Sequence, residues 1–300
     1  MNKILIIGGC GFIGSHLLDF YKGLDEFEAY NADIIIDYAA DKYYFNIGSQ
    51  KDFYSIFEDI EFDFCINASG AANVRFSFEE PLKDYSLNTQ NVFYILDAIR
   101  TFQPNCKLLT LSSAAVYGNP KQLPIKVTDP TMPMSPYGWH KLQSEMLCTE
   151  FNQNFNVRSA VARIFSAYGE GLKKQLFWDM HINISSTGKL DLYGTGQESR
   201  DFIYIKDLVD ALHAIIKSSE FGANAYNVAS GIEVNIASTA EIFTSFYDKE
   251  IPIKFSGEEK IGDPKNWVAD ISDLISFGFK AKYDMQIGLE QYYKWVIERK

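Results

Sequence analysis

Three glycines spaced three residues apart follow an apolar run at the start of the chain. Residues 4–7 are Ile-Leu-Ile-Ile, and an amphipathic stretch continues over residues 12–24. This order predicts a buried strand, a tight turn and a helix. The turn leaves backbone N–H groups at a helix N-terminus, where a pyrophosphate can bind, and a β-carbon would block the close approach of the backbone. The residues expected to line this dinucleotide site are Gly8, Gly11, Phe12, Ile13 and Gly14.

A second apolar run, at residues 34–36, ends at Asp37. An acidic residue about 20 positions beyond such glycines is where a partner for the adenosine ribose belongs. Asp37 is therefore the expected ribose ligand, and Asp33 and Asp41 are alternatives for the same role.

The composition is that of a globular protein large enough to bury a core. Of 300 residues, 47% are hydrophobic and 22% charged, and the formal net charge is −11. This charge argues against nucleic acid or an anionic membrane as a partner. The four cysteines are scattered, without a zinc-binding spacing, so we expect free thiols, no metal site and a cytoplasmic protein. The N-terminus does not resemble a signal peptide, and no apolar stretch approaches membrane-spanning length.

Strand-like and helical segments alternate through the first half. The expected strands are residues 3–7, 33–36, 64–67, 107–112 and 157–165. The expected helices are residues 12–24, 52–59, 82–102 and 137–155. This alternation predicts an α/β fold with a Rossmann-like, doubly wound parallel sheet. Ligands bind beyond the carboxyl ends of such strands, where Gly8, Asp37, Asn67 and Ser112 would lie.

The second half is less regular. Helices are expected at residues 175–186, 206–217, 273–278 and 285–298. We predict a dinucleotide-binding domain over residues 1–165, with a later return to its sheet near residues 225–228. Residues 166–300 would mainly form a smaller α/β lobe that binds the substrate.

Tyr137 and Lys141 have the i, i+4 spacing that places two side chains on one face of a helix. The lysine charge is expected to lower the pKa of the phenol, which could then exchange a proton with a substrate hydroxyl or carbonyl. The segment from Ser112 to Gly118 follows the fourth expected strand. A hydroxyl there could hold the oxygen that Tyr137 protonates.

Together these motifs resemble the extended short-chain dehydrogenase/reductase family, in its nucleotide-sugar epimerase/dehydratase group. The matching residues include the glycine turn, Ser113, Tyr137, Lys141 and the sequence Arg-Asp-Phe-Ile-Tyr over residues 200–204. The likeness covers essentially the whole chain. It is specific for the family and much less so for the reaction.

The resemblance implies roles for individual residues. Tyr137 would be the acid/base, Lys141 would bind the nicotinamide ribose and tune the tyrosine, and Ser113 would assist at the reacting oxygen. Asn46 and Ile47 fall where the family binds adenine. The residues implied at the nucleotide-sugar substrate are Ser113, Tyr137, Ser166, Arg200, Lys260 and Asp263.

Departures from the family pattern narrow the reaction. Ala114 and Ala115 stand where 4,6-dehydratases carry two carboxylic acids, so dehydration of the sugar is rejected. The remaining candidates are reduction of a 4-keto sugar, a 4-epimerase of the UDP-glucose/galactose type, and a non-catalytic NAD(P)-binding regulator. We favour the reductase here, because the link from Asp37 to Asn46 is short and would leave the cofactor uncovered.

The cofactor is expected to be NAD or NADP. Asp37 disfavours a 2′-phosphate, whereas Lys42 could reach one. Relatives pair two helices from each subunit into a four-helix bundle, so the resemblance implies a homodimer. Residues expected at that interface or in the core are Phe93, Leu96, Met146 and Leu147.

Overall fold

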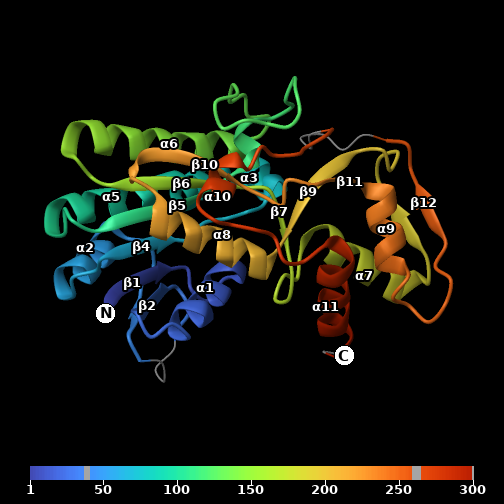
Figure 1. The fold of residues 1–300 in the computed structure, drawn as a ribbon, viewed down its shortest axis with the longest axis horizontal. Coiled ribbons are helices and arrows are strands. Elements are labelled where there is room, and N and C mark those ends of the chain that lie inside the picture. The colour runs from blue at the N-terminus through green and yellow to red at the C-terminus, as the bar shows by residue number, and fades with distance from the viewer. Residues whose placement is uncertain (37–40, 259–264, 299–300) are drawn as a thin grey trace.

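A parallel sheet of seven strands, in the order β10-β6-β5-β4-β1-β2-β3, forms the middle layer of the larger part of the molecule, on the left in Figure 1. The computed structural model describes residues 1–36, 41–258 and 265–298. The strands are β1 (Asn2–Ile7), β2 (Phe27–Asp33), β3 (Tyr43–Phe45), β4 (Phe64–Asn67), β5 (Lys107–Ser113), β6 (Ser159–Ile164) and β10 (Gly222–Val228). The order reverses direction between β1 and β4, which is the switch point where a doubly wound sheet binds its ligand. The predicted fold class is confirmed.

The first strand shows why the sheet is covered on both faces. Ile4 and Ile6 pack into one hydrophobic cluster and Leu5 and Ile7 into another. Because side chains alternate across a strand, these four residues supply both faces in turn. Burying an aliphatic side chain of this size stabilises a fold by about 1.5–3 kcal/mol.

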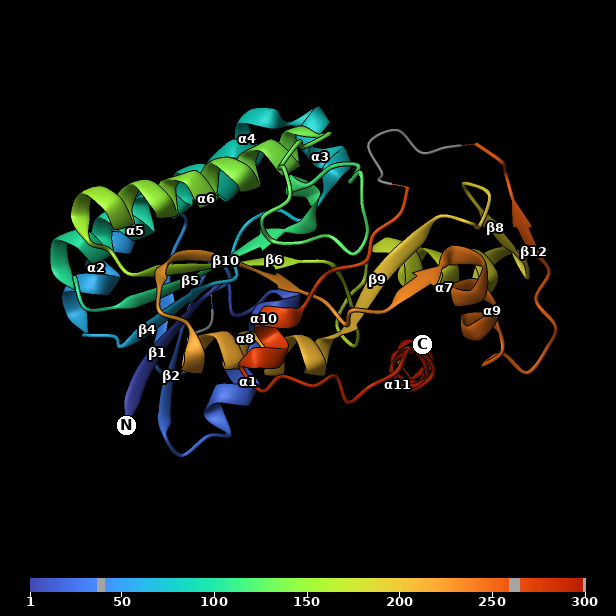
Figure 2. The same cartoon turned by 45° about the horizontal axis from the view of Figure 1, so that its top comes forward.

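Two groups of helices cover those faces (Figure 2). On one side lie α1 (Phe12–Lys22) and α8 (Ile205–Ser218), and on the other lie α2 (Gln50–Asp59), α5 (Asn91–Phe102) and α6 (Pro136–Phe155). Helix α6 begins where the sequence predicts, because Pro136 occupies its first turn and the Ser135 hydroxyl accepts a hydrogen bond from Gly138 N.

The strand predicted at residues 33–36 is wrong. The second strand is β2, which ends at Asp33, and the isoleucines at 34–36 that suggested a strand are more than half exposed. Asp37 lies outside the described residues. The long helix predicted at residues 82–102 is also divided, into α4 (Pro81–Tyr85), a π-helical turn η1 (Ser86–Gln90) and α5.

The chain after β6 forms two small sheets and returns once to the large one. The first small sheet orders β11 (Glu233–Asn235), β9 (Ser199–Tyr204) and β7 (Ser166–Tyr168), and the second pairs β12 (Ile253–Phe255) with β8 (Leu190–Leu192). Besides α8, this part of the described chain contains α7 (Gln175–Thr187), α9 (Ile236–Thr244), α10 (Ser272–Ser276) and α11 (Met285–Ile297). The predicted return near residues 225–228 is confirmed, because β10 pairs with β6. The division into two domains at residue 165 stays a prediction.

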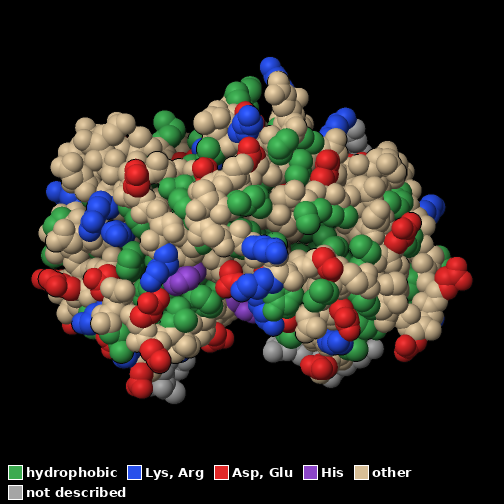
Figure 3. Space-filling view, in the orientation of Figure 1, with side chains coloured by type: hydrophobic (Ala, Val, Ile, Leu, Met, Phe, Trp, Pro, Cys, Tyr) green, Lys and Arg blue, Asp and Glu red, His purple; other side chains and the backbone are tan. Residues whose placement is uncertain are grey.

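The surface carries charges of both signs. Figure 3 shows acidic and basic side chains interspersed across one face, with hydrophobic side chains between them. Among the described residues, no helix is long and apolar enough to cross a membrane. Cys65, Cys106 and Cys148 are buried free thiols, and Cys10 is an exposed one.

Candidate active site

The glycine turn after β1 has the close packing that its sequence predicts. Gly8 has φ +86°, and a β-carbon there would lie 2.8 Å from the backbone nitrogen of Ser69, in the turn after β4. A β-carbon on Gly14 would lie 2.7 Å from the carbonyl carbon of Gly8. In the described part of the chain, no side chain caps the N-terminus of α1 at Gly11. Its backbone N–H groups are thus available to an anionic ligand at the switch point.

Two side chains at the end of β2 hold this turn. The N–H of Gly9 donates to Asn31 Oδ1 at 3.1 Å, and the N–H of Cys10 donates to Asp33 Oδ2 at 2.8 Å. Asp33 therefore occupies the strand-end position that the sequence assigned to Asp37. It is the described carboxylate best placed to bind an adenosine ribose.

The residues expected beside adenine lie just after β3. Asn46 is buried, its Oδ1 accepts from Gly48 N at 2.6 Å, and within the described structure its Nδ2 has no hydrogen-bond partner. A buried donor without a partner is costly, so this amide is suited to a ligand atom. Ile47 follows as an exposed apolar side chain.

The predicted serine, tyrosine and lysine converge at the carboxyl end of β5. Ser113 ends the strand, its hydroxyl accepts from Ala115 N, and its side chain lies close enough to Tyr137 to lower the pKa of that phenol. Lys141 lies one helical turn beyond Tyr137, with Nζ 6.0 Å from the tyrosine ring centroid and 2.9 Å from the carbonyl oxygen of Leu111. Since β5 is two strands from β1, this group lies about 10 Å along the sheet edge from the glycine turn.

Burial dominates the ionisation of both groups. Burial raises the pKa of Tyr137 to about 12, although the Ser113 side chain acts in the opposite direction. Burial lowers the pKa of Lys141 to about 8, and the carboxylates of Asp84 and Glu145 oppose that shift. The expected lowering of the tyrosine pKa by lysine is therefore not found, because burial raises that pKa instead. A cationic ligand beside Tyr137 would favour the tyrosinate.

A buried polar network supports the helix that carries Lys141. Arg163 on β6 makes a bidentate contact with Glu145 on α6, at 2.7 Å for its closest nitrogen and oxygen. Glu145 also accepts from Ser112, and Arg163 donates to the hydroxyl of Tyr117 at 2.8 Å. The network ties α6 to β5 and β6, so it fixes Lys141 relative to Ser113. Sequence analysis missed it, although Glu145 lies four residues after Lys141 on the same helical face.

The predicted substrate residues only partly come together. Ser166 on β7 and Arg200 on β9 lie on neighbouring strands of one small sheet. Arg200 Nη1 donates to the carbonyl of Ser199 at 2.8 Å, and its guanidinium lies 5.9 Å from the ring of Trp267. Lys260 and Asp263 lie outside the described residues. Trp267, which the sequence did not single out, is buried beside Arg200 and donates from Nε1 to the carbonyl of Gly118 at 3.1 Å.

The acidic residue of the Arg-Asp-Phe-Ile-Tyr segment has a structural role. Asp201 is fully buried and accepts hydrogen bonds from Ser230, from Gly231 N and from Ala269 N. Burial raises its pKa to about 6. By joining two loops to β9, Asp201 holds the strand on which Arg200 lies.

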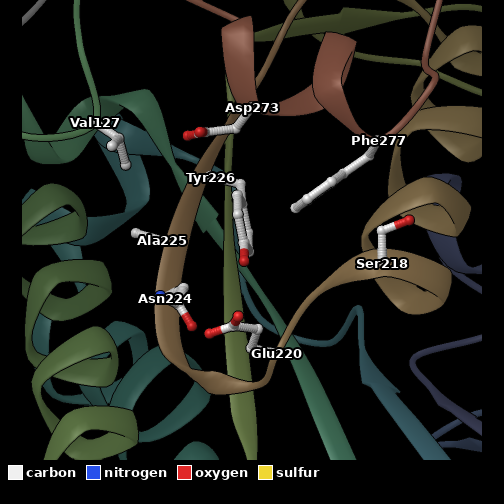
Figure 4. A pocket seen from close by; sticks show the side chains of 8 residues that line it. All are labelled: Val127, Ser218, Glu220, Asn224, Ala225, Tyr226, Asp273 and Phe277. Atoms are coloured by element: carbon white, nitrogen blue, oxygen red, sulfur yellow. The ribbon is translucent and has the colours of Figure 1, made fainter.

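A separate pocket lies beside the edge strand β10 (Figure 4). Tyr226 and Phe277 pack edge to face in its wall, with ring centroids 5.3 Å apart, and Glu220 and Asp273 add two carboxylates. None of the residues predicted for the site lines it. Its acidic groups make it unsuitable for the phosphates of a nucleotide.

Comparison with known proteins agrees with these motifs. The family model described as the NAD dependent epimerase/dehydratase family matches residues 4–229. A UDP-glucose 4-epimerase of Lacticaseibacillus casei is 26% identical over 309 residues, which cover 94% of this chain and 92% of the relative.

Solved structures show the same architecture over the full length. The UDP-N-acetylglucosamine 4-epimerase of Methanobrevibacter ruminantium M1, in complex with UDP-N-acetylmuramic acid, has a TM-score of 0.88 and 25% identity, covering 100% of this chain and 99% of that one. The UDP-glucuronic acid 4-epimerase of Bacillus cereus, in complex with UDP-glucuronic acid and NAD, has a TM-score of 0.88 and 23% identity, covering 99% and 100%. At that identity the second likeness supports the fold alone.

Proposed function

Because the chain belongs to the NAD dependent epimerase/dehydratase family, as its motifs predict, we propose that it is a nucleotide-sugar 4-epimerase. The observation that carries the proposal is the convergence of Ser113, Tyr137 and Lys141 at the sheet edge that also holds the glycine turn. That arrangement suits proton and hydride exchange at one sugar carbon.

The residues present fit a dinucleotide. The closely packed turn and the uncapped N-terminus of α1 suit a pyrophosphate, Asp33 suits the adenosine ribose, and the unpartnered amide of Asn46 suits the adenine. NAD bound there would accept a hydride from the sugar and return it. Lys141 would hold the nicotinamide ribose.

The chain's own residues would handle the proton. Tyr137, as the tyrosinate, takes the proton from the C4 hydroxyl as the hydride leaves C4, which gives a 4-keto sugar. Ser113 donates a hydrogen bond to the same oxygen. Tyr137 then returns the proton to that oxygen when the hydride is delivered to the opposite face of C4. The sugar leaves with inverted configuration and the cofactor unchanged.

The small sheet is the proposed holder of the nucleotide. Arg200 can pair with the diphosphate, because a guanidinium forms strong charge-assisted hydrogen bonds with phosphate oxygens. Ser166, Lys260 and Asp263 remain proposed contacts of the same substrate.

Two observations favour the epimerase over the reductase. A UDP-glucose 4-epimerase is among the relatives, and so is the structure of a UDP-N-acetylglucosamine 4-epimerase. In addition, a reductase was favoured by the short link between Asp37 and Asn46. Since β2 ends at Asp33, that link is four residues longer than assumed.

One experiment separates the candidates. The dinucleotide released from the purified protein is identified, and the untreated protein is offered UDP-glucose, UDP-N-acetylglucosamine or UDP-glucuronic acid without added cofactor. An epimerase retains NAD and forms the C4 epimer of one of these sugars. Stoichiometric use of NADH or NADPH on a nucleotide 4-keto sugar would instead establish a reductase.

The matched control is Tyr137→Phe, which removes one hydroxyl. It should keep the dinucleotide and lose turnover by about 10²–10⁴-fold. Dinucleotide binding without turnover of any of these sugars would favour the non-catalytic regulator.

A homodimer is part of the proposal. Helices α5 and α6 run side by side along one flank of the molecule (Figure 2), and Phe93 and Met146 on them are exposed. Leu96 is fully buried in the core, and Leu147 is partly buried against it. Phe93 and Met146 are thus the proposed contact residues.

A further inference from the structure

A buried carboxylate joins α4 to α6 beside the catalytic pair. Asp84 on α4 is 0% exposed, and its Oδ2 lies 2.5 Å from Nδ1 of His140 on α6. His140 is adjacent to Lys141 in the sequence and lies three residues after Tyr137. Residues three apart on a helix are neighbours on its surface, so Asp84 contacts the helical turn that carries the active tyrosine.

Each oxygen of this carboxylate has a hydrogen-bond partner, so its orientation is fixed. Asp84 Oδ1 accepts from Nδ2 of Asn88 at 3.0 Å, and the same amide nitrogen donates to the carbonyl of Ala71. His140 is held as well, because its carbonyl oxygen accepts from Thr89 Oγ1 at 2.9 Å. Asn88 and Thr89 both belong to the π-helical turn η1. The break in the long predicted helix thus supplies two of the contacts that hold the pair.

The charged groups around Asp84 divide into an inner and an outer set. The inner set is Tyr137, His140 and Lys141 on α6, with the ring of Tyr85 at 5.5 Å from that of His140. The outer set consists of three carboxylates, each of which is paired with its own cation. Glu145 on α6 pairs with Arg163, Arg75 on α3 (Val74–Glu79) pairs with Glu79, and Lys83 on α4 pairs with Glu80. Those on α3 and α4 are solvent-exposed.

We propose that Asp84 and His140 are positioning residues that keep Lys141 protonated in its buried site. This inference rests on the proposed function, because it gives the lysine charge its purpose during proton exchange at Tyr137. The carboxylate supplies the negative charge, and His140 holds that charge in place. In agreement, the charge of Asp84 raises the pKa values of both Lys141 and Tyr137. For the lysine, this effect opposes that of burial. A neutral Lys141 would no longer stabilise a tyrosinate.

The first test is the pH profile of Asp84→Asn. The alkaline limb of kcat should move to lower pH by about one unit, since the negative charge of Asp84 opposes the lowering of the Lys141 pKa by burial. KM for the nucleotide sugar should change less than about twofold, because neither residue is proposed to touch the sugar. Glu80→Gln is the matched control: it removes an exposed carboxylate at the start of the same helix and should leave the profile unchanged.

Substitutions of His140 provide an independent test. His140→Asn places an amide donor near the position of Nδ1. The alkaline limb of its kcat profile should therefore stay at the wild-type pH. His140→Ala removes the donor that holds the Asp84 carboxylate in place and should move the alkaline limb of kcat to lower pH, as Asp84→Asn does. Equal profiles for these two variants would overturn the role of His140. These variants also decide the matter if Asp84→Asn does not fold.

An activity-independent readout separates this inference from the proposed function. The ¹³Cε resonance of Lys141, assigned by its loss in Lys141→Arg, reports protonation directly. Its titration midpoint should fall in Asp84→Asn and in His140→Ala. An unchanged midpoint in both would overturn the inference even if the enzyme epimerises sugars. A lowered midpoint with no sugar turnover would uphold the electrostatic pairing and reject the epimerase.

Discussion

Gly14, in the first turn of α1, packs directly against Gly8, so that a β-carbon on Gly14 would lie 2.7 Å from the carbonyl carbon of Gly8. Backbone cannot yield as a flexible side chain does, so Gly14→Ala must displace α1 from the turn. We expect dinucleotide binding to be lost and the free energy of unfolding to fall by about 1–3 kcal/mol. Isothermal titration with NAD and denaturant unfolding measure the two effects.

Gly23→Ala is the control for this prediction. Gly23 follows the same helix, has φ −82°, and its added β-carbon would meet its nearest neighbour at an ordinary 3.4 Å. It should leave NAD binding unchanged. Equal affinity in Gly14→Ala and the wild type would show that the turn does not hold the cofactor.

The position of Asp33 predicts which acidic residue binds the ribose. Its carboxylate already orients the turn through Cys10 N, and it ends the strand that adjoins β1. Asp33→Ala should weaken NAD binding at least tenfold, or about 1.4 kcal/mol. Asp37→Ala should have little effect. The reverse ranking would restore Asp37 as the ribose ligand.

The wrongly placed second strand shows where sequence patterns fail in this chain. Three consecutive isoleucines at residues 34–36 suggest a buried strand more strongly than the Phe-Glu-Ala-Tyr-Asn-Ala-Asp of β2. Pairing with β1 nevertheless selects β2, because register and packing against neighbours outweigh local apolar content. By contrast, β4 is predicted without error, since its apolar run is bounded by polar residues and is buried in the sheet.

The site was predictable where its geometry is local. Tyr137 and Lys141 share a face of one helix, and the glycine turn is contiguous in sequence. The contacts between Arg163 and Glu145 and between His140 and Asp84 join separate elements. No spacing rule brings such residues together, so only the packed structure reveals them.

Lys141 predicts a pH dependence of stability. Its pKa is about 8 in the folded protein, below the 10.5 of an unburied lysine. Between these values the unfolded chain binds more protons than the folded one, so the free energy of unfolding rises with pH through this window. Lys141→Met removes the buried charge and should add about 1–3 kcal/mol at pH 7. That advantage should shrink toward pH 10.5.

Denaturant unfolding at pH 7, 8.5 and 10 measures this difference. Lys141→Arg retains its charge across the whole range and should lack the gain in stability that the wild type shows above pH 8. A constant difference between Lys141→Met and the wild type at all three values would contradict a depressed lysine pKa. The methionine variant should also lose turnover, which separates stability from function at one residue.

The buried pair of Arg163 and Glu145 predicts strong coupling. Arg163→Met leaves the Glu145 carboxylate buried without its counter-ion and should cost about 3–5 kcal/mol of unfolding free energy. Replacing both residues by methionine should recover much of that loss, because no charge then remains buried. Lys294→Met, which removes an exposed ion pair with Glu290, serves as the control. Its change in unfolding free energy should fall within experimental scatter. Additive losses in the double variant would argue against the coupling.

The outward side chains of α5 and α6 predict how the protein assembles. Phe93 is 40% exposed and Met146 63% exposed. Large apolar side chains exposed on adjacent helices are typical of a surface that another subunit covers. Met146→Glu would place a charge in that contact and should convert a dimer into a monomer with its fold intact. Sedimentation velocity at micromolar concentration measures the change, and Ile182→Glu, at an exposed isoleucine on α7, is the control that should remain dimeric. A monomeric wild type would refute the dimer, whereas a dimer that survives Met146→Glu would move the interface away from α6.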